Sequence, residues 1–350
     1  MNMNRPRRIE ALALLCMVAS CAAFGGEAGK PVRTILCTTF PIYQFTRNVA
    51  EGSASVSVNL LLPAEMGCPH DYALTPRDMA KIADADMLII NGLGMEEFMG
   101  KPVEQANPAI LIVDSSLGIE ELIQDDDHRH DADHHHDGEH HHHDDHDHDG
   151  EHHEHEHDDG DRNHEERHDH EHAHHHHHGL DPHLYTSPAL AARIVENIAA
   201  RLCLFDPDGV GIYAANGNAY AQRLRALSGE MKEAAGQFAN SRIIEPHGAF
   251  DYLCRDLGVE IVARLQPHGQ ELSASQMLDL LDVIKEKKPA VIVVEPQYPT
   301  KAGETLAAEA GIQVISLDSF ATGPDDAPLD YYETVMRANL AVLTSVLGGE

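Results

Sequence analysis

The 350-residue sequence contains no tryptophan, and aromatic residues make up only 5% of it. Positive charge is also scarce, because 25 Lys and Arg face 58 Asp and Glu and leave a formal net charge of −33. A chain this acidic, without a basic stripe, is a poor match for nucleic acid or for an anionic lipid surface. After the leader, no apolar run reaches the roughly 18 residues that a membrane-spanning helix needs. We therefore expect neither a nucleic-acid-binding protein nor a membrane-spanning one.

Motifs for redox and hydrolytic chemistry are missing as well. None of the six cysteines stands in a CxxC spacing, which argues against a redox or cysteine-zinc motif. No HExxH motif occurs, and a zinc hydrolase would also need an open water position and a general base. We therefore expect no enzymatic activity. Four cysteines lie outside the leader; they are Cys37, Cys68, Cys203 and Cys254. In an oxidising compartment we expect one or two disulfides among them, and four cysteines allow three complete pairings.

The first 21 residues have the pattern of an export signal. A basic segment with three arginines precedes an apolar stretch from Ala11 to Ala19, which is too short to span a bilayer. The stretch ends in Val18-Ala19-Ser20-Cys21, which resembles a bacterial lipobox. We expect an exported, periplasmic or extracytoplasmic protein, anchored by lipid at Cys21. Plain secretion, with cleavage near Ala22 or Ala23, is the alternative.

Short apolar runs alternate with helical patterns in both halves of the chain, which predicts βα units around parallel sheets. We expect an α/β fold with two lobes, 32–205 and 239–350, joined by one long rigid helix over 206–238. At 1.5 Å per residue, a helix of that length spans about 45 Å and can run along both lobes. The strands are expected near residues 32–38, 55–62, 87–90, 109–113, 242–245, 259–265, 290–294 and 313–316.

An insert at 124–178 interrupts the first lobe. It holds 24 of the 28 histidines, interleaved with Asp and Glu, and it has no hydrophobic periodicity. Such a segment cannot bury a core, so we expect it to be disordered. Imidazoles at this density favour additional, weakly bound Zn²⁺. A solvated acidic spacer without a role in metal binding is the alternative.

The histidines outside the insert share a local pattern, because each follows a proline. His70, His183 and His247 are each expected at a position beyond a strand or beside the cleft between the lobes, where α/β proteins bind ligands. Asp318 follows the last strand, and three imidazoles with one carboxylate suit tetrahedral Zn²⁺. His268 also follows a proline but lies beyond a different strand, so it is left out of the set. Glu245, Glu96 and Asp181 are candidate hydrogen-bond partners for the imidazole N–H groups.

Five motifs stand in the order typical of one family: 38–43 (TTFPIY), 68–76 (CPHDYALTP), 91–94 (NGLG), 181–183 (DPH) and 247–252 (HGAFDY). With them the chain resembles the metal-binding receptors of bacterial ABC importers, the cluster A-I or ZnuA-like group. The resemblance covers about 32–347 outside the insert. It implies two α/β lobes joined by a long helix, a metal buried in the cleft between the lobes, and a membrane permease as partner.

The resemblance also implies the ligands. By position they fall on His70, His183 and His247, with Asp318 at the fourth, carboxylate position. Manganese-type relatives usually have Glu at the third position, so His247 points to Zn²⁺ as the transported ion. A charged His-rich insert before the Asp-Pro-His motif is also typical of the zinc type. The implied protein is a monomer that captures Zn²⁺ outside the cytoplasmic membrane and delivers it to an ABC permease.

Two residues depart from the family pattern, and two alternatives stay open. Gly248 stands at a position where the family often has Asp. Cys68, two residues before the ligand position His70, stands where the family often has a residue other than cysteine. A manganese or iron receptor of the same family is the first alternative. The second is a secreted zinc buffer or chaperone in which the insert is the working part.

Overall fold

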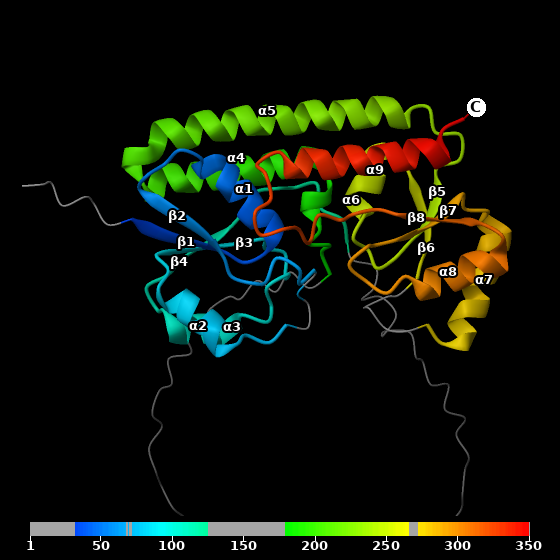
Figure 1. Ribbon diagram of the computed structural model, residues 1–350, viewed down its shortest axis with the longest axis horizontal. Coiled ribbons are helices and arrows are strands. Elements are labelled where there is room, and N and C mark those ends of the chain that lie inside the picture. The colour runs from blue at the N-terminus through cyan, green and yellow to red at the C-terminus, as the bar shows by residue number, and fades with distance from the viewer. Residues whose placement is uncertain (1–31, 68, 70–71, 125–178, 266–271, 350) are drawn as a thin grey trace, which may run out of the picture.

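The computed structural model describes residues 32–67, 69, 72–124, 179–265 and 272–349. Within these ranges it contains two sheets of four parallel strands, one in each half of the molecule (Figure 1). The first sheet has the order β2-β1-β3-β4, with β1 Arg33–Cys37, β2 Val56–Leu60, β3 Met87–Ile90 and β4 Leu111–Asp114. The second has the order β6-β5-β7-β8, with β5 Arg242–Glu245, β6 Glu260–Arg264, β7 Val291–Val294 and β8 Gln313–Ser316. The two predicted α/β lobes are confirmed.

Helices cover both faces of each sheet (Figure 1). On the outer faces, α2 and α3 pack against the first sheet, and α7 and α8 pack against the second. The remaining helices and the inner faces of both sheets form one continuous apolar core. The bounds are α1 Phe40–Ala50, α2 Pro76–Ala83, α3 Gly100–Ala106, α4 Pro188–Phe205, α5 Val210–Ala235, α6 Asp251–Leu257, α7 Ala274–Lys287, α8 Lys301–Ala310 and α9 Tyr331–Leu347, with 3-10 turns at Leu184–Thr186 and Pro207–Gly209.

Burial on both faces explains the apolar runs in the sequence. In β1, Ile35 and Cys37 face the continuous core, whereas Leu36 between them packs on the α2 and α3 side. A strand with both faces covered needs apolar residues at every position, so it loses the alternating pattern of a half-exposed strand.

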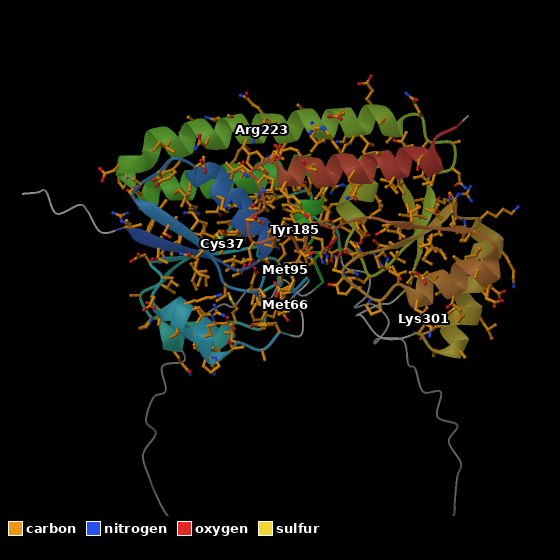
Figure 2. All side chains as sticks on the ribbon, viewed as in Figure 1. Cys37, Met66, Met95, Tyr185, Arg223 and Lys301 are labelled. Atoms are coloured by element: carbon orange, nitrogen blue, oxygen red, sulfur yellow. The ribbon has the colours of Figure 1, made fainter. Side chains whose placement is uncertain are left out.

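Tyr185, fully buried at the middle of the molecule in Figure 2, accepts a hydrogen bond at its carbonyl from the Tyr332 hydroxyl of α9 (2.8 Å).

The long helix that joins the lobes is α5. Its 26 residues correspond to about 39 Å. It contacts α1 and α4 in the first half and α6 and α9 in the second. The helix expected over 206–238 is shorter at both ends, because Pro207–Gly209 forms a 3-10 turn and α5 ends at Ala235. The joining role is confirmed.

A second connection between the lobes is the segment 319–330, which we call the strap. It leaves β8 in the second lobe and crosses onto α1 in the first. Arg47 and Asn48 of α1 donate to the carbonyls of Ala327 and Leu329, each at 2.8 Å, and Gln44 donates to the carbonyl of Pro328. The lobes are therefore held together by both α5 and the strap.

The disulfide expectation is wrong for the described cysteines. Cys37, Cys203 and Cys254 are free, so none of the three complete pairings is formed. They belong to different elements, β1, α4 and α6, and Cys37 is enclosed in the core (Figure 2). Burial raises the pKa of the Cys37 thiol to about 12, which makes it unreactive.

Several predicted features lie outside the described residues. They are the leader 1–21 with Cys21, the insert after Gln124, Cys68, His70 and His268. In the ranges that the structure does describe, no helix combines the length and the apolar character that crossing a membrane requires.

Candidate metal centre

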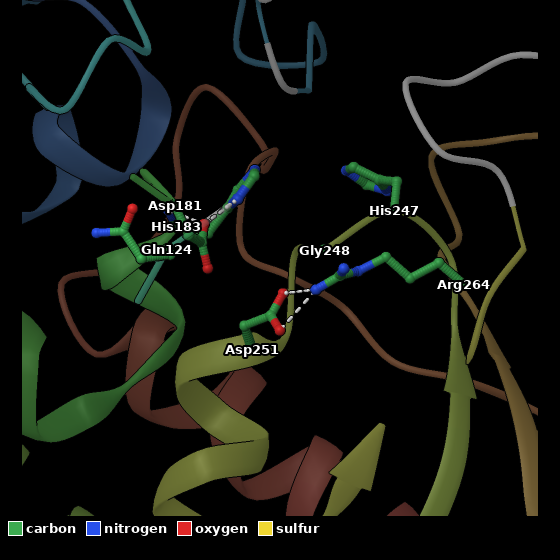
Figure 3. Close-up of a pocket in the computed structure, with 7 residues that line it drawn as sticks. All are labelled: Gln124, Asp181, His183, His247, Gly248, Asp251 and Arg264. Atoms are coloured by element: carbon green, nitrogen blue, oxygen red, sulfur yellow. Dashed lines mark hydrogen bonds and ion pairs between the residues drawn. The ribbon is translucent and has the colours of Figure 1, made fainter. Parts of the chain in front are cut away.

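A small cavity lies where the lobes meet. Its volume is about 20 Å³, enough for one or two water-sized occupants and too small for an organic ligand. Figure 3 shows the two histidines at this cavity with acidic residues and an arginine nearby. The lining residues come from the segments that flank the insert, from the ends of β5 and β6 and from the start of α6; they are Gln124, Asp181, His183, His247, Gly248, Asp251 and Arg264.

The His183 side chain is fixed by Asp181. One carboxylate oxygen, Oδ1, accepts from the His183 ring Nδ1 at 2.7 Å and from the His183 backbone N–H at 2.8 Å. Both residues are 4% exposed. An ionised carboxylate can only accept hydrogen bonds, so Nδ1 carries the hydrogen and Nε2 is the nitrogen with which this imidazole can bind a metal. The sequence prediction that Asp181 is an imidazole partner is confirmed.

The peptide that carries His183 is held from both lobes. Asn91, directly after β3, donates its side-chain N–H to the carbonyl of Pro182 at 2.9 Å. From the second lobe, the Tyr252 hydroxyl of α6 donates to the carbonyl of Asp181 at 2.8 Å. These bonds explain how a loop between the insert and α4 reaches a defined position.

Glu96 supports Asn91 and has no described contact with a histidine. Its carboxylate accepts from the Asn91 backbone N–H at 2.7 Å, from Thr38 at 2.6 Å and from the Gly92 N–H at 3.1 Å. Burial raises the pKa of Glu96 to about 7, and these three donors oppose the rise. Glu96 is thus a buried anchor for the 91–94 turn, which the prediction of an imidazole partner did not foresee.

The partner of His247 is Glu295, which the sequence analysis missed. Glu295 Oε1 lies 3.1 Å from His247 Nδ1, and Glu295 is 1% exposed. The His247 ring also lies 5.9 Å from the His183 ring and 5.3 Å from that of Tyr298, centroid to centroid. A signal was present, because Glu295 is the first residue after an entirely apolar strand and its side chain is therefore placed at the ligand-binding end of the sheet.

The expected histidine partner Glu245 instead binds an arginine. Its carboxylate accepts from Arg264 Nε at 2.7 Å and from the Phe250 N–H at 3.2 Å. Arg264 also donates to both oxygens of Asp251, at 2.8 and 2.9 Å (Figure 3). Burial raises the pKa of Glu245 to about 7, and Asp251 adds to the rise while Arg264 opposes it. Gly248 adopts φ +91°, a conformation that a side chain would strain.

Asp318 is near Glu295 but is not among the residues that line the cavity. Its Oδ1 accepts from the Phe320 N–H at 2.8 Å, and its backbone N–H and carbonyl bond the Asn339 side chain of α9 at 2.9 and 2.7 Å. Burial raises the pKa of Asp318, and the nearby Glu295 carboxylate raises it further. The described structure therefore places His183 and His247 at the same cavity, whereas Asp318 is not part of its lining.

The predicted four-ligand set includes His70, which lies outside the described residues. Among the residues that are described, no three His, Cys, Asp or Glu side chains form a group able to hold a metal ion. The complete set of His70, His183, His247 and Asp318 therefore stays a prediction.

Comparisons with known proteins agree on one family. The family model described as "Zinc-uptake complex component A periplasmic" matches residues 35–346. The Bacillus subtilis protein named "High-affinity zinc uptake system protein ZnuA" is 30% identical over 345 residues, covering 96% of this chain and 95% of its own. The "Zinc-binding lipoprotein AdcA" of Streptococcus pneumoniae serotype 4 is 28% identical over 95% of this chain, which spans 59% of that longer protein. A solved structure, "Crystal structure of ZnuA", superposes with a TM-score of 0.67 and 23% identity, covering 91% of this chain and 100% of the other, and shows the same fold.

Proposed function

The chain belongs to the family of periplasmic zinc-uptake components, and from this premise we propose that it captures Zn²⁺ outside the cytoplasmic membrane and delivers it to an ABC permease. The observation that carries the proposal is the pair His183 and His247 at one ion-sized cavity. Each has a carboxylate on Nδ1, the arrangement typical of histidines that bind metal through Nε2.

We propose His70, His183, His247 and Asp318 as the ligands. The donor set supports zinc, because three imidazoles and one carboxylate match its tetrahedral preference, whereas Mn²⁺ and Mg²⁺ favour more oxygen ligands. Asp318 follows β8, which pairs with β7, so its carboxylate is at the same end of the sheet as Glu295 and His247. A manganese or iron receptor is less well supported, since no carboxylate stands at the third position.

The same proposal accounts for the absence of enzymatic motifs. Four protein ligands close the coordination shell and leave no open position for a substrate, which suits a carrier rather than a hydrolase. The ion is cargo, so binding and release are the chemistry that the site performs. Release would require the ligands of the two lobes to separate.

The remaining predictions, on export, anchoring, domains and the insert, are consistent with this function. We propose export by the leader 1–21, with lipid attachment at Cys21, and a monomer with lobes 32–205 and 239–350 joined over 206–238. The streptococcal relative is named a lipoprotein, which supports the anchor. Additional weakly bound Zn²⁺ in 124–178 would make the insert an accessory store. If the insert were instead the working part, the protein would be a zinc buffer.

Competitive zinc titration of a protein without the insert tests the proposal. Gln124 and Leu180 form an antiparallel bridge, so 125–178 can be replaced by a short Gly-Ser linker without moving either end. We expect one tight Zn²⁺ per chain, which outcompetes Mn²⁺. In this background His247→Ala should weaken binding by more than the ~10–100-fold that is typical of losing an outer partner.

His268→Ala is the matched control, because His268 also follows a proline but is outside the proposed ligand set. It should retain the affinity of the parent. Loss of tight zinc on deletion of 125–178 alone would contradict the cleft site and support the buffer. Equal losses in His247→Ala and His268→Ala would contradict the ligand assignment.

A further inference from the structure

Glu295 is a buried carboxylate that belongs to no proposed ligand set. It is the first residue after β7, and its Oε1 lies 3.1 Å from His247 Nδ1. Its other oxygen, Oε2, accepts from the side-chain amide of Gln297 at 2.5 Å. The same amide nitrogen donates to the Ser319 hydroxyl at 3.0 Å. Ser319 is fully buried and directly follows Asp318.

We propose that Glu295 is a positioning residue that fixes the His247 imidazole and, through Gln297 and Ser319, ties the His247 loop to the Asp318 loop. The inference rests on the proposed function, since it assigns a role toward two of the proposed ligands. The second lobe then presents His247 and Asp318 to the ion as one pre-organised unit.

The sheet explains why these residues meet. β5 and β8 both pair with β7, so the three carboxyl ends lie side by side. His247 follows β5, Glu295 follows β7, and Ser319 follows β8. A carboxylate beyond the middle strand of the three can reach both neighbouring loops, which no residue beyond an outer strand could do.

The charge of Glu295 explains why a bound ion would strengthen the contact. A carboxylate that is 1% exposed loses its hydration and needs a positive or hydrogen-bonding partner. In the part of the chain that the structure describes, its ion pair is with His247. A metal bound at His247 Nε2 would make the ring more positive, so its attraction to the Glu295 carboxylate, 3.1 Å from Nδ1, would increase. The contact is therefore worth more in the loaded protein than in the empty one, and it raises affinity.

The test measures zinc affinity by competition and the visible absorption spectrum of the Co²⁺-loaded protein. Glu295→Gln keeps the size of the side chain and removes its charge. We expect zinc binding to weaken by about 10–100-fold, with a changed Co²⁺ ligand-field spectrum, because the His247 ring is no longer held. Glu333→Gln is the matched control, since Glu333 is also a buried carboxylate but pairs with Arg223, 3.1 Å away. Its affinity and spectrum should equal those of the parent.

Unchanged affinity and spectrum in Glu295→Gln would overturn the inference. His247→Ala, measured alongside, separates this failure from failure of the proposed function: if that variant also retains tight zinc, His247 is not a ligand and the proposed function is what fails. Should Glu295→Gln not fold, Gln297→Met leaves the carboxylate in place and removes its link to Ser319. It must then weaken zinc binding, and parental affinity in it would equally overturn the inference.

Discussion

The amide of Asn91 holds the peptide that carries His183. Asn91 is fully buried and donates to the Pro182 carbonyl at 2.9 Å, while Asp181 accepts from the His183 N–H at 2.8 Å. The peptide is thus bonded on both its oxygen and its nitrogen. At the residue scale, the position of a proposed metal ligand is set by neighbours that are not themselves proposed as ligands.

We expect Asn91→Ala to weaken zinc binding by about 10-fold and to lower the free energy of unfolding by about 1–3 kcal/mol, because a buried carbonyl loses its donor. Asn107→Ala is the control, since Asn107 also clasps two carbonyls, those of Ile82 and Ala85, but lies away from the cavity. It should lose stability and keep its affinity. Denaturant unfolding and zinc competition measure both, and equal affinity in the two variants would contradict the positioning role of Asn91.

The carboxylate partner of a histidine could be predicted from the sequence only where both residues belong to one short motif. The Asp181-Pro182-His183 motif placed Asp181 next to the imidazole it bonds, because the two are separated by a single stiff residue. Glu245, equally close to His247 in sequence, was assigned the same role and instead binds Arg264. The partner of His247 is 48 positions away, and only the pairing of β5 with β7 brings it there.

At the scale of elements, α4 and α5 pack closely along one side of the first lobe. The approach is tightest at Gly217, where an added Cβ would lie 2.5 Å from the Cβ of Ala199. Real Cβ atoms do not come this close, so any side chain at 217 pushes the helices apart. Gly229, in the same helix, has nothing within 4 Å of an added Cβ.

We therefore expect opposite effects from the same substitution at these two glycines. Gly217→Ala should lower the free energy of unfolding, since overpacking costs ~1–3 kcal/mol and outweighs the gain of up to ~1 kcal/mol in helix propensity. Gly229→Ala should raise it by about 0.5–1 kcal/mol, because only the propensity gain applies. Urea denaturation measures both, and a stabilised Gly217→Ala would show that α4 and α5 are not in the close packing described.

The strands and the long joining helix were predictable from the sequence, and the shortest helices were not. All eight strands were expected within one or two residues. The inner strands β3 and β7 are unbroken apolar runs because both faces are covered, whereas the edge strand β2 alternates. The two helices of seven residues, α3 and α6, have no clear pattern in the sequence. Helices this short form only because the fold packs them, so propensity gives little signal. Gly258, at φ +66° after α6, is the one local marker that could have indicated the end of that helix.

At the scale of the whole molecule, α5 and the strap join the lobes at separate places. Opening the cleft as a wide hinge would bend α5 and break the bonds from Arg47 and Asn48 to the strap. We therefore expect zinc-free and zinc-loaded protein lacking the insert to have the same radius of gyration by small-angle scattering. Release then depends on local movement of loops.

The control is thermodynamic and uses the same samples. At 100 times its Kd, zinc should raise the free energy of unfolding by about 2.7 kcal/mol, which establishes that the ion is bound during the scattering measurement. A large decrease in the radius of gyration on loading would show that the two connections yield, and would contradict the rigid frame.

The overall plan was predictable because length, repeated βα patterns and one long helix restrict the arrangement to two lobes with a joining backbone. The strap was not predictable, because 319–330 has no periodic pattern. It contacts α1 through bonds to its own carbonyls and through the Phe320 ring, which lies 5.3 Å from the Phe40 ring, centroid to centroid.

The two sheets share one strand order, and this gives the halves of the receptor equivalent positions. β3 and β7 are the third strands of their sheets, and each is followed directly by a buried polar residue, Asn91 in one half and Glu295 in the other. Each of these residues supports a different histidine, one with a neutral amide and one with a carboxylate. Substitutions at Asn91 and Glu295 can therefore change the affinity for the ion while the proposed ligands stay the same. Selection or design can act on affinity at these two equivalent positions without changing which ion the ligands prefer.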